Sequence, residues 1–115
     1  MAPKVEAYRH GEIVIDGRTY RQDVIIFPDR VLSPWWREEG HSLSLADVWE
    51  VVEVQPEVFV IGQGSMGRME VPPETRRELS KRGMRVIVEP TPLAVKTYNA
   101  LRERAHVVAA LHLTC

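Results

Sequence analysis

The fold is decided by three apolar runs in the second half of the chain: Val58-Phe59-Val60-Ile61, Arg85-Val86-Ile87-Val88, and the nearly continuous run over residues 106–113. Each run has the length of a buried strand, and each is separated from the next by a segment long enough for a helix. The predicted order is therefore β-α-β-α-β. Right-handed crossovers between such strands place them parallel in one sheet.

Prolines and a glycine mark the helices of this unit. Pro72 and Pro73 suit the first turn of a helix, and Gly83 suits the position just after its end. Thr91 and Pro92 form an N-cap and N1 pair for the next helix. These signals place the two helices in the segments between the apolar runs.

The first quarter of the chain predicts antiparallel strands. Residues 12–16 alternate apolar and polar side chains, and Asp16-Gly17 is a favoured hairpin turn, so residues 18–22 return antiparallel. Val24-Ile25-Ile26-Phe27 is a short apolar run typical of a buried interior strand, which Pro28 ends. Added to the second half, this hairpin predicts a mixed sheet with helices packed on it.

No periodic pattern appears between Pro28 and Ser42. A connection of this length in a compact domain is usually functional, unless it contains a short helical turn. After it, Ser44 and Asp47 form a weak capping box for a helix that Pro56 limits.

Length and charge narrow the class of protein. The chain has 115 residues, 44% hydrophobic and 27% charged, with a net charge of −1. This composition predicts one folded domain over residues 1–115, and it argues against a nucleic-acid partner, which needs a basic face. No apolar run approaches the length needed to cross a bilayer, so no membrane association is expected. The lone Cys115 has no internal disulfide partner, and no secretory signal is visible, which favours the cytoplasm.

A glycine-rich loop follows the first of the three runs. Gly62-x-Gly64-x-x-Gly67 imitates a dinucleotide fingerprint, with Glu89 near the expected distance, but the helix can begin only at Pro72, about a turn too late. A tight turn is the favoured interpretation. A cradle for an anion or small ligand is the alternative, and no cofactor is predicted. The candidate ligand-binding residues are Gly62, Gln63, Gly64, Ser65, Arg68, Glu89 and Lys96.

No catalytic or metal-binding residues are predicted. The loop around Ser65 lacks the G-x-S-x-G pattern, and nothing in the sequence places a base beside that serine. His106 and His112 have the spacing of one strand face, but no third ligand follows at metal-binding distance.

The segment without periodicity carries the candidate partner-binding residues. They are Arg30, Trp35, Trp36, Arg37 and His41. Two adjacent tryptophans in irregular chain cannot easily both point inward, so one is expected in the core and the other in solvent. Tryptophan and arginine are enriched at interface hot spots, which favours an interaction surface. Plain cover of the core is the alternative.

Seven runs of residues, spread over nearly the whole chain, match a known family. They are Gly11-Glu12-Ile13-Val14-Ile15-Asp16-Gly17, Asp23-Val24-Ile25-Ile26-Phe27-Pro28, Pro34-Trp35-Trp36-Arg37, Ile61-Gly62-Gln63-Gly64, Thr91-Pro92-Leu93-Ala94-Val95, Tyr98-Asn99 and Val108-Ala109-Ala110-Leu111. On these residues the chain resembles the Mth-type hypothetical-protein family, which includes the mammalian adipogenesis-associated domain protein and a mitochondrial complex I assembly factor. The resemblance implies a compact three-layer α/β fold with a central mixed sheet. It carries over no catalytic residue and no cofactor, and it favours assembly or regulation.

Three functional hypotheses follow. The first is a non-enzymatic binding, assembly or regulatory module that contacts a protein partner through the tryptophan segment. The second is a small-ligand or enzyme site at the glycine-rich loop. The third is a homo-oligomer formed by pairing of an exposed strand edge in the hairpin region.

Overall fold

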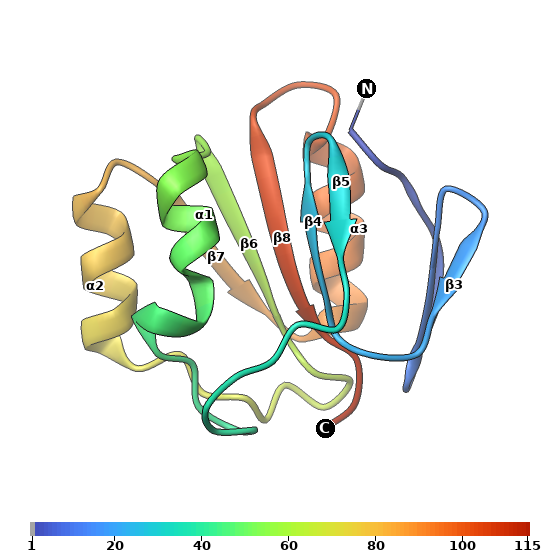
Figure 1. The fold of residues 1–115 in the computed structure, drawn as a ribbon, viewed down its shortest axis with the longest axis horizontal. Helices are drawn as coiled ribbons and strands as arrows, with labels where there is room; N and C mark the ends of the chain where they lie inside the picture. The colour runs from blue at the N-terminus through green and yellow to red at the C-terminus, as the bar shows by residue number, and fades with distance from the viewer. Residues whose placement is uncertain (1) are drawn as a thin grey trace.

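The computed structural model describes residues 2–115 (Figure 1). In chain order the elements are β1 (Val5–Arg9), β2 (Glu12–Ile15), β3 (Arg18–Tyr20), β4 (Val24–Phe27), β5 (Arg30–Leu32), the 3-10 helix η1 (Leu45–Val48), α1 (Trp49–Val54), β6 (Val58–Gln63), α2 (Pro73–Lys81), β7 (Arg85–Glu89), α3 (Thr91–Leu101) and β8 (Val107–His112). None of the helices in this range is both long and apolar enough to cross a membrane.

The central sheet is mixed, as the sequence predicts. Its strand order is β5-β4-β8-β6-β7. Strand β6 runs parallel to both β7 and β8, while β4 runs antiparallel to β8 and β5. The parallel β-α-β-α-β half is therefore confirmed. The N-terminal strands form a separate antiparallel sheet in the order β1-β2-β3.

Two hydrophobic cores lie on the two faces of the central sheet. On one face, Tyr98 of α3 and Ile13 of β2 pack with Ile26 and Ala109. On the other, the helices α1 and α2 cover the alternate residues of the same strands, and Phe59 is fully buried there. This arrangement, visible in Figure 1, confirms the three-layer fold. It follows from the pleat, because successive side chains of a strand point to opposite faces.

Two local predictions are corrected by the structure. The segment that starts at Pro28 contains a strand, β5, which turns back on β4 with Phe27 opposite Arg30. Thr91 is the first residue of α3 and does not cap it; Pro90 occupies that position. The Thr91 hydroxyl is engaged elsewhere, because it accepts a hydrogen bond from the Gly64 amide and donates one to the His112 carbonyl.

The helix after Ser44 is composite. It begins as the 3-10 turn η1 and continues as α1, and the Ser44 amide donates to Asp47 Oδ2 at 2.9 Å. It ends at Gln55, whose φ of 52° leaves the helical region just before Pro56. The loop that precedes this helix is bonded to it through the Trp35 indole N–H and the Asp47 carbonyl, and to the central sheet through Arg37 and Asp23.

Candidate functional site

A buried ionic cluster joins three distant parts of the chain at the carboxyl end of β8. Because β4 runs antiparallel to β8, Asp23 at the start of β4 lies beside His112 at the end of β8. Asp23 Oδ2 is 2.8 Å from Arg37 Nη1 and 2.8 Å from His112 Nδ1. Asp23 Oδ1 accepts the Leu113 amide at 2.8 Å. The side chains of Arg37 and His112 are only 6% and 8% exposed.

The surroundings of Asp23 favour its ionised form. Burial by itself raises the pKa of this carboxyl group. Hydrogen bonds from His112, from the Leu113 amide and from Arg37 act the other way, and the pKa lies below its ordinary value. The Asp23 carboxylate is 15% exposed and has several polar groups beside it, so the cluster links β4, β8 and the loop that carries Arg37.

The two tryptophans beside this cluster differ in exposure. Trp35 is 3% exposed, its indole N–H donates to the Asp47 carbonyl at 2.9 Å, and its amide donates to the Asp23 carbonyl at 2.9 Å. The Arg37 guanidinium lies over its ring at 4.7 Å from the centroid. Trp36, the next residue, is 75% exposed. The prediction that one tryptophan enters the core and the other faces solvent is confirmed.

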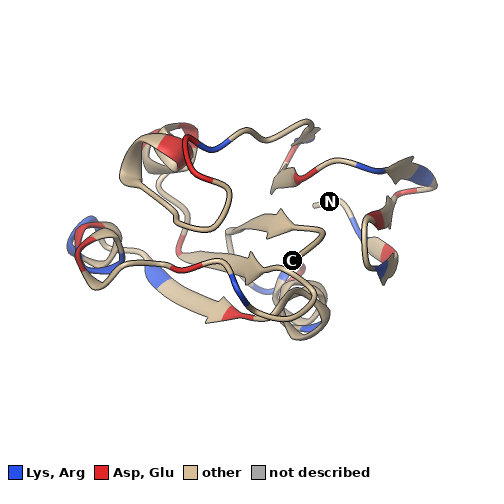
Figure 2. Ribbon diagram, turned by 90° about the horizontal axis from the view of Figure 1, so that it is seen from below, with Lys and Arg blue, Asp and Glu red and all other residues tan. Residues whose placement is uncertain are grey.

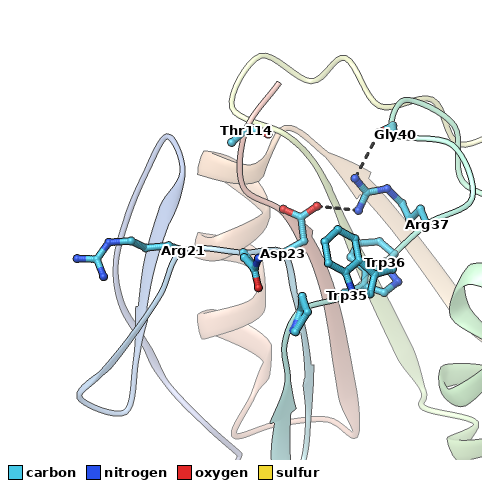
Figure 3. Close-up of a pocket in the computed structure, with 9 residues that line it drawn as sticks. Arg21, Asp23, Trp35, Trp36, Arg37, Gly40 and Thr114 are labelled. Carbon is cyan, nitrogen blue, oxygen red and sulfur yellow. Dashed lines mark hydrogen bonds and ion pairs between the residues drawn. The ribbon is translucent and has the colours of Figure 1, made fainter.

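A pocket of about 360 Å³ opens beside Trp36. Figure 3 shows the Arg37 side chain reaching toward Asp23 and Gly40 at one side of it, and the Gly40 carbonyl accepts a hydrogen bond from Arg37 at 3.3 Å. The pocket combines aromatic surface with charged groups of both signs. Its lining residues are Arg21, Gln22, Asp23, Pro34, Trp35, Trp36, Arg37, Gly40 and Thr114.

The other two residues predicted with the tryptophans lie outside this pocket. Arg30 is the first residue of β5, beside the turn that joins it to β4, where it pairs with Asp29 and Glu50 and lies over the Phe27 ring. His41 is exposed, and its carbonyl accepts the amide of Glu70. The structure therefore brings Trp35, Trp36 and Arg37 together and separates Arg30 from them.

The glycine-rich loop is packed against the last residues of the chain. The Gly64 amide donates to Thr91 Oγ1, the Ser65 amide to the Thr114 carbonyl, and the Gly67 amide to the Gly64 carbonyl. A Cβ on Gly64 would lie 2.7 Å from the Thr114 carbonyl oxygen. These three amides are engaged within the protein, which favours the tight turn. The ligand cradle stays a prediction.

The remaining residues of that predicted cradle are only partly brought together. Glu89 lies opposite Gly62 on the neighbouring strand and accepts a hydrogen bond from Thr97 at 2.6 Å. Gln63 donates through its side chain to the Met69 carbonyl, and Arg68 is exposed. Lys96 lines a different depression, between α3 and β1.

One expectation about Ser65 is wrong. His10 Nδ1 lies 2.7 Å from Ser65 Oγ, so a base does stand beside this hydroxyl. The contact joins residues 55 positions apart, and no local sequence motif predicts it. His10 is exposed, and Ser65 Oγ also lies 3.1 Å from the Thr114 carbonyl.

The cluster residues Asp23 and His112 were not singled out as site residues by sequence reasoning. Each is a polar residue within or directly beside an apolar strand, and buried polar groups in such places need partners. That pattern was the available signal. The sequence does not show which strands pair, and it is the pairing of β4 with β8 that makes these two residues neighbours.

Fold and site together define the class: a three-layer α/β protein whose sheet carries, at one end, a loop with an exposed tryptophan held by a buried ionic cluster. The chain belongs to the family described as Protein of unknown function (DUF498/DUF598), whose model matches residues 5–112. Membership of this family and the similarities below confirm the resemblance to Mth-type proteins.

Three relatives illustrate the family. The NADH dehydrogenase (ubiquinone) 1 alpha subcomplex assembly factor 3 of Danio rerio is 31% identical over 99 residues, which cover 84% of this chain. The match covers 55% of that relative, so the chain spans about half its length. The crystal structure of a conserved hypothetical protein from Pyrococcus horikoshii OT3 matches with a TM-score of 0.82 and 25% identity, over 97% of this chain and 99% of that one.

The third is a Bordetella pertussis protein whose solution structure is described as a Mth938-like domain. It matches with a TM-score of 0.77 at 22% identity, over 96% of this chain and 85% of that one. At this identity the similarity shows the fold alone.

Proposed function

We propose that this chain is a non-enzymatic binding module that holds a protein partner through the surface around Trp36. The observation that carries the proposal is the difference in exposure between the Trp36 side chain and the two residues on either side of it. Trp36 is 75% exposed, while its neighbours Trp35 and Arg37 are buried and bonded to Asp23. A single exposed apolar side chain needs no explanation by itself, so the proposal also rests on the pocket that opens beside Trp36.

The fixed backbone is what makes this tryptophan a good anchor. A side chain presented by an already ordered loop loses little further freedom when a partner binds. Tryptophan is the residue most enriched at interface hot spots, and an arginine beside it is common there. The 360 Å³ pocket next to Trp36 offers a place for a side chain of the partner.

The named relative supports a protein partner. Its name calls it an assembly factor of an NADH dehydrogenase subcomplex. We propose the same general role for this chain as one domain over residues 1–115, in the cytoplasm, where the lone Cys115 stays reduced.

Photocrosslinking from position 36 tests this directly. A photoreactive amino acid with a large aromatic side chain replaces Trp36 in cells, so that the aromatic contact is kept, and the same replacement at Trp49 is the matched control, since Trp49 is 50% exposed on α1. We expect a discrete crosslinked protein from position 36 that is absent from position 49.

A second pair of variants measures how much the Trp36 side chain contributes to the free energy of partner binding. Trp36→Ala should reduce recovery of the crosslinked partner at least tenfold in co-purification, about 1.4 kcal/mol or more. Trp49→Ala should leave it unchanged, and both variants should melt near the wild-type temperature. Equal recovery with both variants refutes the proposal.

A further inference from the structure

Strand β7 leaves one edge of the central sheet open. It is the outermost strand, paired only with β6. The Arg85 amide donates to the Glu57 carbonyl at 2.9 Å, on the β6 side. Since backbone groups alternate in direction along a strand, the amide and carbonyl groups of Val86 and Val88 point away from the sheet. Within residues 2–115 no hydrogen bond to these four groups is found.

Two copies of this strand placed antiparallel bring opposite charges together at both ends. Arg85-Val86-Ile87-Val88-Glu89 has a basic residue at one end, an acidic residue at the other and apolar residues between. We propose that β7 pairs antiparallel with β7 of a second copy of this chain, about a two-fold axis at Ile87. Each Arg85 then lies opposite Glu89 of the other copy.

The hydrogen-bonding pattern selects the same register independently. With Ile87 on the axis, Val86 lies opposite Val88 of the second copy. These are the residues whose amides and carbonyls point outward, so each such pair exchanges two hydrogen bonds. Arg85 and Glu89 fall in non-hydrogen-bonded pairs, where the side chains of opposite residues approach most closely. A shift by one residue breaks both arrangements.

Side-chain placement at this edge is compatible with pairing. Val86 and Val88 belong to the α2 face and Ile87 to the α3 face, and all three are half-buried. Glu89 accepts a hydrogen bond from Thr97 Oγ1 at 2.6 Å, which holds its carboxylate on the α3 face, the face that Arg85 shares by alternation. Figure 2 shows β7 along the outer side of the sheet, with Lys/Arg blue at its start and Asp/Glu red at its end.

The opposite edge of the sheet lacks these properties. Strand β5 has three residues, Arg30–Leu32, with no acidic residue to oppose Arg30. Pairing through β7 joins two five-stranded sheets into one and leaves the Trp36 surface of each copy at another place on the molecule. The dimer is therefore independent of the proposed partner site.

Charge reversal at the strand ends is the first test. Arg85→Glu places two carboxylates opposite each other at both ends of the pairing, and it should weaken the dimer at least about tenfold. The double variant Arg85→Glu/Glu89→Arg restores opposite charges and should restore the dimer. Arg77→Glu, the same charge change on the exposed face of α2, is the control. Sedimentation velocity from micromolar to near-millimolar concentration distinguishes the monomer of 13.2 kDa from a dimer of twice that mass.

Disulfide trapping is the second test, and it does not depend on the charge variants folding well. In a Cys115→Ser background, Ile87→Cys places two thiols opposite each other on the axis, where the Cα separation of a non-hydrogen-bonded pair suits a disulfide. Val86→Cys is the matched control, because its two copies are offset from one another. We expect a covalent dimer from the variant at position 87 and none from the variant at position 86.

Three results would overturn the proposal. They are a wild-type monomer over the whole concentration range, a dimer equally stable in Arg85→Glu, and equal trapping from positions 86 and 87.

Discussion

Replacing Asp23 with alanine should lower the free energy of unfolding by about 3–5 kcal/mol. The carboxylate accepts hydrogen bonds from Arg37 Nη1 and the Leu113 amide, each at 2.8 Å, and it lies 2.8 Å from His112 Nδ1. Its loss leaves the Arg37 guanidinium, 6% exposed, as a buried charge with no opposite charge beside it. Breaking one half of a buried pair costs far more than the pair contributes as a whole, because the remaining charge stays out of water.

This loss converts into a large change in melting temperature. Unfolding entropy is about 2.1 cal/mol/K per residue, which for a chain of 115 residues is about 0.24 kcal/mol/K. The expected fall in melting temperature is therefore roughly 12–20 °C. Calorimetry or circular dichroism at neutral pH measures it.

A double variant separates charge from packing. Asp23→Ala/Arg37→Met removes both charges and keeps an apolar stem over the Trp35 ring. It should recover at least about half of the lost stability, because no buried charge is left unpaired. Two results would refute this reasoning: a fall of less than about 4 °C for Asp23→Ala, which corresponds to about 1 kcal/mol, or a double variant no more stable than the single one.

Two further predictions concern acid stability and the glycine loop. The pKa of Asp23 lies below its ordinary value of 3.8, so its contribution is present above that pH and is lost as the pH falls through the folded pKa. Urea unfolding against pH should show this acid loss in the wild type and a smaller one in Asp23→Asn; equal slopes would contradict it. Gly64 has a φ of 96° and no room for a Cβ, so Gly64→Ala should cost roughly 2–5 kcal/mol. Gly17 has a φ of 80° in open space, so Gly17→Ala should cost only about 1–2 kcal/mol, and the reverse ranking would contradict the packing argument.

The strands and helices were largely readable from local patterns. The run Val58-Phe59-Val60-Ile61 lies within β6, and Gly83 follows α2 with a φ of 89°, as its position predicts. Strand β5 was missed because Arg30–Leu32 is short and half-exposed, and it is held by pairing with β4, which has no local signal.

The candidate site was only half visible. Trp36 was a candidate because of its residue type. Its adjacency to Trp35 predicted that one of the two side chains is buried and the other exposed. Asp23 and His112 are 89 positions apart, and their contact exists because β4 and β8 are antiparallel neighbours. The same holds for the contact between His10 and Ser65, which no local pattern in the sequence indicates.

By itself the sequence determined the fold class, the parallel half of the sheet and the loop that presents Trp36, because apolar periodicity, prolines and glycines act within a few residues of where they stand. Only the tertiary structure decided which polar groups meet in the buried cluster, which amides of the glycine loop are engaged, and which edge of the sheet stays open. Those outcomes depend on strand order and register, which arise when distant segments pack against one another to exclude water.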